Sequence, residues 1–159
     1  MNHIFAAWRM DYVAAPKHEG CIFCDFPPEM RDRERYILYR GAEFFVILNV
    51  YPYNPGHLMV APYRHTNLYE SLTGGEHAEM SRLTAEAVRT LKRAMAPDGF
   101  NIGMNLGKTA GAGIADHLHL HVVPRWNGDN NFMPVIADTR VVPEALDATY
   151  VKLKEHWGA

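Results

Sequence analysis

The stretch His117-Leu118-His119-Leu120-His121, followed by Val122 and Val123, guides the interpretation of the whole chain. Polar and apolar residues alternate in it with a period of two, which predicts a β-strand. Side chains two residues apart in a strand point to the same face, so we expect the three imidazoles on one face and the apolar residues on the other. Polar faces of strands more often carry Thr, Lys, Glu or Ser. Three imidazoles in succession therefore favour a chemical role.

The spacing of the imidazoles limits what that role is. Each strand residue rises roughly 3.3 Å, so His117 and His121 are about 13 Å apart at Cα, whereas zinc–nitrogen bonds are about 2.0–2.1 Å long. Two imidazoles at positions i and i+2 can share a metal ion, but all three cannot. A neutral imidazole is a nucleophile and a general acid–base near pH 7. The strand therefore predicts catalysis, with neighbouring rings holding His119 in the required tautomer.

A glycine-rich loop precedes this strand, from Gly107 to Ala115. Glycines let backbone N–H groups approach an anion closely, as in phosphate-binding nests. Directly before three imidazoles, the loop predicts a phosphate lying against the strand. Gly107-Lys108-Thr109 is not a Walker loop, because the earlier glycine is missing and no helix is expected to follow.

The length of 159 residues, with 48% hydrophobic and 21% charged residues, predicts one globular domain. We divide it (1–159) into an irregular N-terminal segment (1–34), a core (35–125) and a C-terminal extension (126–159). A net charge of -2 gives no electrostatic case for nucleic acid or an acidic membrane. No apolar run reaches membrane-spanning length, and Met1 to Tyr12 does not resemble a secretory signal. We therefore expect a cytoplasmic protein with no nucleic-acid or membrane partner.

Turn residues divide the core into short strands around one long helical segment. Gly41-Ala42 and Asn54-Pro55-Gly56 separate strand-like runs and make the sheet antiparallel. We predict an α+β fold with an antiparallel five-stranded sheet, one long central helix and a short C-terminal helix. The strands are expected at residues 36–40, 43–50, 57–63, 100–106 and 117–124.

The long helix has start and end signals of its own. Thr73-Gly74-Gly75-Glu76 resembles a capping box, and Pro97-Asp98-Gly99 ends the helix. Its apolar face has helical spacing and consists of Met80, Leu83, Ala87, Leu91 and Met95. The C-terminal helix is expected to start at Pro143 and to end near Trp157.

Both cysteines lie in Cys21-Ile22-Phe23-Cys24. A pair this close rarely forms a stapling disulfide, but Cys-x-x-Cys is half of a zinc site and needs two more ligands. A thioredoxin-type redox motif would stand at the start of a helix, and Pro27-Pro28 follows too soon for one.

Taken together, these segments resemble the histidine triad (HIT) superfamily of nucleotide hydrolases and transferases. His117-Leu118-His119-Leu120-His121-Val122-Val123 is similar to its signature. The other similar segments occur in the family's order and, with the signature, cover most of residues 8–135: Cys21-Ile22-Phe23-Cys24, Asn54-Pro55-Gly56-His57, Pro62-Tyr63-Arg64-His65 and the glycine-rich loop. The resemblance implies a HIT-like α+β fold and a homodimer formed through the central helix and a strand.

The resemblance also implies a mechanism. His119 would attack the α-phosphorus of a nucleotide, with adenine favoured, and form a covalent nucleotidyl-histidine. His121 would hydrogen-bond the phosphate or the scissile oxygen, while His117 and His57 orient the nucleophile. The nucleotide would be bound at Asn105, Gly111, Ala112, Gly113 and Ile114 (phosphate oxygens), Asn49 (ribose), Phe23 and Ile47 (base) and Trp126 (second base). Core packing is the alternative for Phe23 and Ile47, and packing of the C-terminal segment the alternative for Trp126 and Phe132.

Some HIT proteins complete a zinc site with the two histidines that correspond to His65 and His117. The resemblance thus implies a structural Zn2+ held by Cys21, Cys24, His65 and His117. It leaves open whether Mg2+ accompanies the substrate phosphates.

Three functions follow from the resemblance. His121 stands where transferase branches usually carry Gln, which favours hydrolysis of a diadenosine polyphosphate or an adenylated small molecule. Trp8-Arg9 and the stretch from Pro124 to Asp129 resemble bacterial diadenosine tetraphosphate phosphorylases, which favours phosphorolysis instead. A nucleotide-binding signalling module with little turnover is the third.

Overall fold

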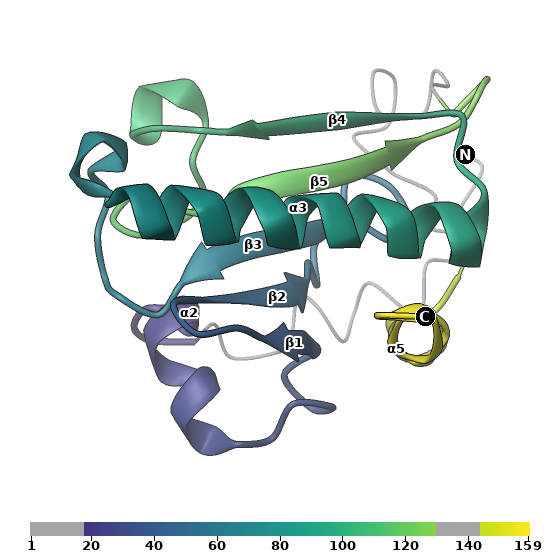
Figure 1. Ribbon diagram of the computed structural model, residues 1–159, viewed down its shortest axis with the longest axis horizontal. Helices are drawn as coiled ribbons and strands as arrows, with labels where there is room; N and C mark the ends of the chain where they lie inside the picture. Colours follow the sequence, from purple (N-terminus) through teal and green to yellow (C-terminus); the bar gives the residue numbers. More distant parts are fainter. Residues whose placement is uncertain (1–17, 130–143) are drawn as a thin grey trace, which may run out of the picture.

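The computed structural model describes residues 18–129 and 144–159. Its centre is a five-stranded antiparallel sheet in the order β1-β2-β3-β5-β4 (Figure 1). The strands are β1 (Ile37–Arg40), β2 (Phe44–Leu48), β3 (Leu58–Pro62), β4 (Gly99–Met104) and β5 (Leu120–Arg125). Together with the helices this is the predicted α+β fold, which is confirmed.

The long helix α3 (Gly74–Met95) lies across one face of the sheet (Figure 1). It begins with the predicted capping box, in which the Thr73 side chain accepts from the Glu76 N–H and the Glu76 carboxylate accepts from the Thr73 N–H. Four of the five predicted apolar residues are buried, and Met95 packs against them half-buried. This face of the sheet forms the main hydrophobic core, to which β2, β3, β5 and the segment just before β5 contribute alternate residues: Phe44, Val46, Leu48, Leu58, Val60, Leu118 and Val122.

The second helix on this side is α5 (Leu146–His156). Its Tyr150 hydroxyl donates to the carbonyl oxygen of Ile37 at 3.1 Å, and Lys154 Nζ donates to that of Leu38 at 2.7 Å. These bonds fasten the C-terminal helix to β1. The predicted start at Pro143 lies outside the described residues.

The opposite face of the sheet carries a smaller core beneath the short helix α2 (Ile22–Asp25). The residues between those of the main core point here: Phe45, Ile47, Met59 and Ala61, joined by Phe23 and Ile37. His119 and His121 alternate with Leu118, Leu120 and Val122, whose side chains pack into the main core. The predicted separation of imidazoles and apolar residues onto two faces is therefore confirmed.

Two sequence-based expectations were wrong in detail. The strand with the imidazoles begins at Leu120 and not at His117, because β3 and β5 pair only from Leu58 to Val60. Before Leu120 the chain leaves the ladder, and the Leu118 N–H donates to the carbonyl oxygen of Thr66 at 2.7 Å.

The described part of the N-terminal segment is also not irregular throughout. The single turn α2 ends at Asp25, and Pro27 opens a 3-10 turn over Pro27–Glu29. A proline is compatible with the first turn of a helix because its missing N–H has no partner there. Pro27-Pro28 therefore does not exclude a short helix at the cysteine pair.

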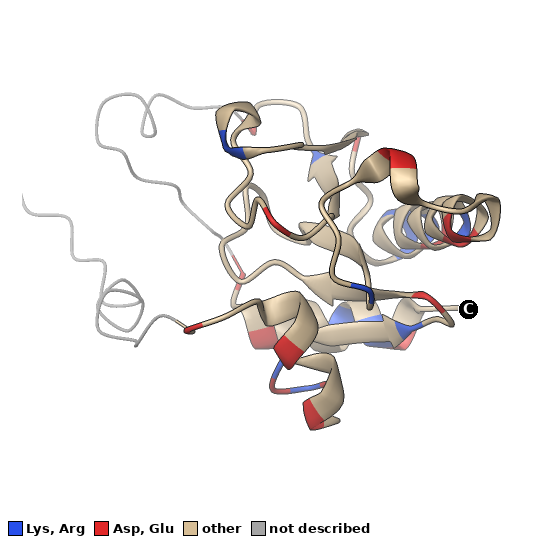
Figure 2. Ribbon diagram, turned by 90° about the vertical axis from the view of Figure 1, so that its left-hand side faces the viewer, with Lys and Arg blue, Asp and Glu red and all other residues tan. Residues whose placement is uncertain are grey.

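No helix among the described residues is long and apolar enough to cross a membrane. Figure 2 shows that both basic and acidic positions are spread along the ribbon of the described residues.

Candidate active site and metal site

His119 is buried and held in one tautomer. Its side chain is 6% exposed, and its ring centroid lies 5.0 Å from that of Phe23. Nδ1 of His119 lies 2.8 Å from the main-chain oxygen of His117. A carbonyl oxygen only accepts, so Nδ1 carries the proton and Nε2 keeps its lone pair. Burial lowers the pKa of His119, although the bond to His117 opposes this shift. The ring is thus a neutral imidazole with a bare Nε2, which is the nucleophilic form.

His57 and His121 form a second pair whose tautomers are also fixed. The main-chain N–H of Tyr53 donates to Nδ1 of His57 at 3.1 Å, so the proton of this buried ring lies on Nε2. His57 Nε2 lies 2.9 Å from Nδ1 of His121 and donates to it. The proton of neutral His121 therefore lies on Nε2. Asn49 supports the pair, with Nδ2 at 3.3 Å from Nδ1 of His57.

Burial lowers the pKa of His121 to about 4, with a smaller contribution from the charge that His119 can carry. His121 is therefore neutral at pH 7, and its Nε2–H is a hydrogen-bond donor. The rings of His119 and His121 are neighbours, with centroids 4.8 Å apart. The site thus combines a bare imidazole nitrogen with a neutral donor on the adjacent ring.

Four side chains from three segments of the chain converge on a second point, and these are Cys21, Cys24, His65 and His117. Their ligand atoms all lie within 4.8 Å of one another. His117 Nδ1 lies 3.3 Å from Cys21 Sγ and 3.2 Å from His65 Nδ1, and Cys24 Sγ lies 3.2 Å from His65 Nδ1. Bonds of about 2.0–2.3 Å in a tetrahedron place ligand atoms roughly 3.3–3.8 Å apart, which agrees with this cluster. In residues 18–129 and 144–159 it is the one group of three or more such side chains placed to hold an ion.

The protonation of the cluster also fits a metal ion. His117 is 1% exposed, and its Nε2 donates to the carbonyl oxygen of Pro62 at 2.8 Å, which leaves Nδ1 as the ligand atom. Burial lowers the pKa of His117. Burial and the adjacent Cys21 side chain raise the pKa of the Cys24 thiol to about 11, and a bound cation would reverse this by stabilising the thiolate.

The predicted catalytic residues thus fall into two groups. His57, His119 and His121 lie together, whereas the imidazole of His117 faces the cysteines and only its main-chain oxygen contacts His119. The expected association of Cys21 and Cys24 with two histidines is present in full.

Of the residues predicted to contact the base, Phe23 and Ile47 are both buried in the smaller core. Phe23 also contacts the rings of His117 and His119, at centroid distances of 5.2 and 5.0 Å. Asn49, the predicted ribose ligand, is half-buried, and its Oδ1 accepts from the Tyr51 N–H at 2.9 Å. Phe23 thus lies against His119 and Asn49 against His57, and nucleotide contact by Phe23, Ile47 and Asn49 stays a prediction.

The predicted phosphate-binding residues follow the end of β4. Asn105 comes directly after this strand and is half-buried. The loop then forms a 3-10 turn over Lys108–Ala110, and Gly111 has a φ of +91°, which a side chain would disfavour. Ala112 and Ile114 are half-buried, Gly113 is exposed, and Ile114 packs against the smaller core. Trp126 follows β5 and is half-buried, whereas Phe132 lies outside the described residues.

Sequence reasoning missed Tyr53. Its main-chain N–H fixes the tautomer of His57, and its ring lies 4.7 Å from that of His57 and 5.8 Å from that of His121. A main-chain contribution leaves no side-chain pattern to find. The one available signal was the aromatic residue just before the Asn54-Pro55-Gly56 turn.

Comparison with known proteins agrees with this geometry. The model of the HIT domain family matches residues 31–128. A Mycobacterium tuberculosis protein named AP-4-A phosphorylase is 47% identical over 165 residues, covering 99% of this chain and 85% of its own. A Zn-bound histidine triad family protein from Mycobacterium smegmatis has 29% identity and a TM-score of 0.69, covering 86% of this chain and 92% of its own. A hypothetical histidine triad nucleotide-binding protein from Sulfolobus tokodaii has 28% identity and a TM-score of 0.66, covering 86% of this chain and 88% of its own. The HIT domain model matches residues 31–128, and the imidazole strand, the sheet and α3 lie in the expected arrangement. The chain therefore belongs to the HIT domain family.

Proposed function

We propose that this protein cleaves diadenosine tetraphosphate at the α-phosphorus by phosphorolysis, through a covalent nucleotidyl-His119. The observation that carries the proposal is the buried, neutral His119 with a bare Nε2 next to the neutral donor His121. The choice of phosphate over water as the acceptor is supported by the 47% identity with a relative named AP-4-A phosphorylase over nearly the whole chain.

The reaction has two balanced steps. In the first, the lone pair on His119 Nε2 forms a bond to the α-phosphorus, the bond from this phosphorus to the bridging oxygen breaks, and ATP leaves. In the second, an oxygen of inorganic phosphate attacks the same phosphorus, the phosphorus–nitrogen bond breaks, and ADP leaves while His119 is regenerated. Covalent catalysis of this kind divides one difficult displacement into two easier ones.

The other predicted residues have supporting roles in this proposal. The Nε2–H of His121 hydrogen-bonds the α-phosphate or the scissile oxygen, where negative charge develops. His57 keeps His121 in the donating tautomer. The nucleotide is held by Asn105 and the backbone from Gly111 to Ile114 at the phosphate, by Asn49 at the ribose, and by Phe23, Ile47 and Trp126 at the bases.

We further propose that the ion at Cys21, Cys24, His65 and His117 is a structural Zn2+. Two thiolates and two imidazoles are a common zinc ligand set, and the solved relative from Mycobacterium smegmatis is described as Zn-bound. Bound there, zinc would fasten α2 to the segment before β5. Mg2+, if it accompanies the substrate, is expected on the phosphates, because the described residues offer no second cluster of ligands.

The homodimer is part of the same proposal, with the edge strand β4 at its centre. β4 stands at the end of the sheet, and Ile102 on this strand is 49% exposed. An exposed edge strand presents N–H and C=O groups that pair readily with a second chain. Light scattering of wild type and Ile102→Lys tests this, with a mass of two chains expected for wild type and of one for the variant. A monomeric wild type would contradict it.

Product analysis separates the three candidate functions. The protein is incubated with diadenosine tetraphosphate, with and without inorganic phosphate. ADP and ATP that form only with phosphate support phosphorolysis. AMP and ATP in both samples would replace it with hydrolysis. Nucleotide binding without any turnover, on this substrate and on adenylated small molecules, would replace it with the signalling module.

A further inference from the structure

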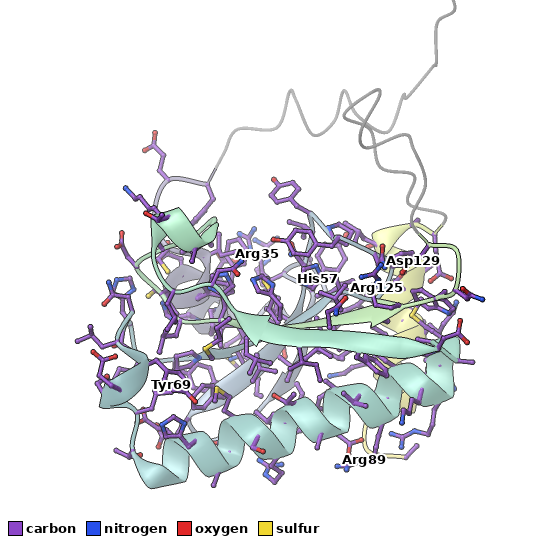
Figure 3. The ribbon with its side chains drawn as sticks, turned by 90° about the horizontal axis from the view of Figure 1, so that it is seen from above. Arg35, His57, Tyr69, Arg89, Arg125 and Asp129 are labelled. Carbon is purple, nitrogen blue, oxygen red and sulfur yellow. The ribbon has the colours of Figure 1, made fainter. Side chains whose placement is uncertain are left out.

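The stretch from Pro124 to Asp129 contains the end of β5 and the turn that follows it, and the reaction described above uses no charged group from it. Its two charged side chains are Arg125 and Asp129, whose labels appear near that of His57 in the view from above (Figure 3). Hydrogen bonds through Asn54 connect Asp129 to the turn before His57.

Asp129 is the centre of a dense hydrogen-bond network, although it lies after the last strand. Its Oδ2 accepts from Arg125 Nε at 2.6 Å, from Asn54 Nδ2 at 2.8 Å and from the Trp126 N–H at 3.1 Å. Its Oδ1 accepts from Arg125 Nη2 at 2.7 Å. The side chain is 12% exposed. The Arg125 guanidinium holds the pKa of this carboxyl far below its usual range, so Asp129 is an anion at any physiological pH.

One of these bonds leads directly to the candidate active site. The carbonyl oxygen of Asn54 accepts from the His57 N–H at 3.2 Å, so Asn54 and His57 close the same turn. The Asn54 amide also donates to the carbonyl oxygen of Pro124 at 3.0 Å. His57 in turn donates to His121. A single side chain, that of Asn54, therefore separates the Asp129 carboxylate from the turn that presents His57.

The network also reaches the edge strand β4. Arg125 Nη1 donates to Asn101 Oδ1 on β4 at 2.6 Å. The ion pair thus joins β4, the end of β5 and the Asn54 turn. A carboxylate suits this position because it accepts the planar fork of the arginine and the Asn54 amide together. An amide at position 129 would have one acceptor oxygen and would turn an NH2 group toward a donor.

From these contacts we infer that Asp129 is a positioning residue of the candidate active site, which holds the Asn54 turn where His57 can donate to His121. The expected change in kcat rests on the proposed function. The expected change in the His57–His121 hydrogen bond does not depend on which substrate the protein uses. Asp129 touches no reacting atom and acts through Asn54 and His57.

The test compares Asp129→Asn with Asp32→Asn. Asp32 is the matched control because it also binds an arginine fork, with Arg40 Nε at 3.0 Å and Nη2 at 2.6 Å from its Oδ1, and takes no part in the site. For Asp129→Asn we expect kcat for diadenosine tetraphosphate to fall about ten- to a hundredfold, the range expected when a catalytic group is slightly misplaced, while KM changes little. For Asp32→Asn we expect kcat within about twofold of wild type, because surface ion pairs contribute little.

A second readout needs no substrate. Imidazole 15N chemical shifts report which ring nitrogen carries the proton, and we expect the signals of His57 and His121 to move in Asp129→Asn and to stay in Asp32→Asn. If wild type lacks turnover, the proposed function fails and the chemical shifts still decide the inference. Asn54→Ala removes the same link and keeps the ion pair, so it replaces Asp129→Asn if that variant does not fold. Unchanged His57 and His121 signals in the folded variant, or a kcat equal to that of Asp32→Asn, would overturn the inference.

Discussion

The main-chain oxygen of His117 accepts the Nδ1–H of His119 at 2.8 Å, while the imidazole of His117 points to the cysteine pair, with Nδ1 at 3.3 Å from Cys21 Sγ. One residue therefore contributes its backbone to the proposed nucleophile and its side chain to the proposed metal site. Whatever fixes the His117 side chain also fixes the carbonyl oxygen that sets the tautomer of His119. Metal content and turnover are therefore expected to change together.

Loss of a metal ligand should reduce both metal content and turnover. We expect His65→Asn to bind less than one zinc per chain and to lose turnover about ten- to a hundredfold, as when groups around a metal site are removed. His77→Asn is the control, because His77 lies on α3 against Tyr69 and outside the metal cluster. Metal analysis of protein purified without added zinc, with assays on the same samples, checks this. Wild type without zinc, or full zinc content in His65→Asn, would disprove the zinc assignment.

Replacement of the nucleophile should abolish turnover without abolishing binding. We expect His119→Asn to lose at least about 10^4-fold in kcat, because an amide cannot form the covalent intermediate. Calorimetric titration with a nucleotide measures the binding that remains. Mass spectrometry of wild type mixed briefly with substrate should detect the nucleotidyl adduct, and the variant should show none. Turnover near wild type in His119→Asn would remove it from the nucleophile position.

Acid should destabilise the fold through His121. An imidazole in the unfolded chain titrates near pH 6.5, whereas burial lowers the pKa of folded His121 to about 4. Between these values the unfolded chain binds more protons, so the free energy of unfolding falls as the pH falls from about 6.5 toward 4. Above pH 6.5 this contribution is fully present and constant. Urea unfolding at a series of pH values should show a shallower slope for His121→Gln than for wild type. Equal slopes would mean that His121 titrates normally.

Glycine at position 56 should be more important for stability than glycine at position 128. Both residues have positive φ, +78° and +79°, so alanine costs about 1–2 kcal/mol at either position. A Cβ at Gly56 would also lie 2.7 Å from Met95 Sδ and 2.9 Å from Leu91 Cδ2, whereas nothing lies within 4 Å at Gly128. Crowding of this kind costs about 1–3 kcal/mol more.

We therefore expect Gly56→Ala to lower the free energy of unfolding further than Gly128→Ala, in denaturant titrations of both variants. An equal loss would mean that the core around Leu91 yields to the extra methyl group. The comparison isolates packing because the two substitutions share the same backbone cost.

The sequence by itself determined which residues share one face of a strand or of a helix. Alternation along residues 117–123 assigned His119 and His121 to one face, and helical spacing assigned Leu83, Ala87 and Leu91 to the core beneath α3. Such patterns are local, because the periods of strand and helix fix which side chains share a face. The capping box at Thr73 was readable for the same reason. The cysteine pair predicted half of a zinc site, and the family resemblance identified the two histidines that would complete it.

The family resemblance had already assigned His117 to the zinc ligands, but only the tertiary structure shows how the imidazoles divide between two groups. The strand pattern places His117 with His119 and His121, but the end of the β3–β5 ladder at Leu120 lets its side chain turn to the cysteines. The tautomers of His119 and His57 depend on main-chain groups of His117 and Tyr53, which no residue type encodes. The bond from Asp129 to Asn54 joins residues 75 positions apart in the chain. Contacts of this kind form only when distant segments pack together, so they follow from the fold and not from any local pattern.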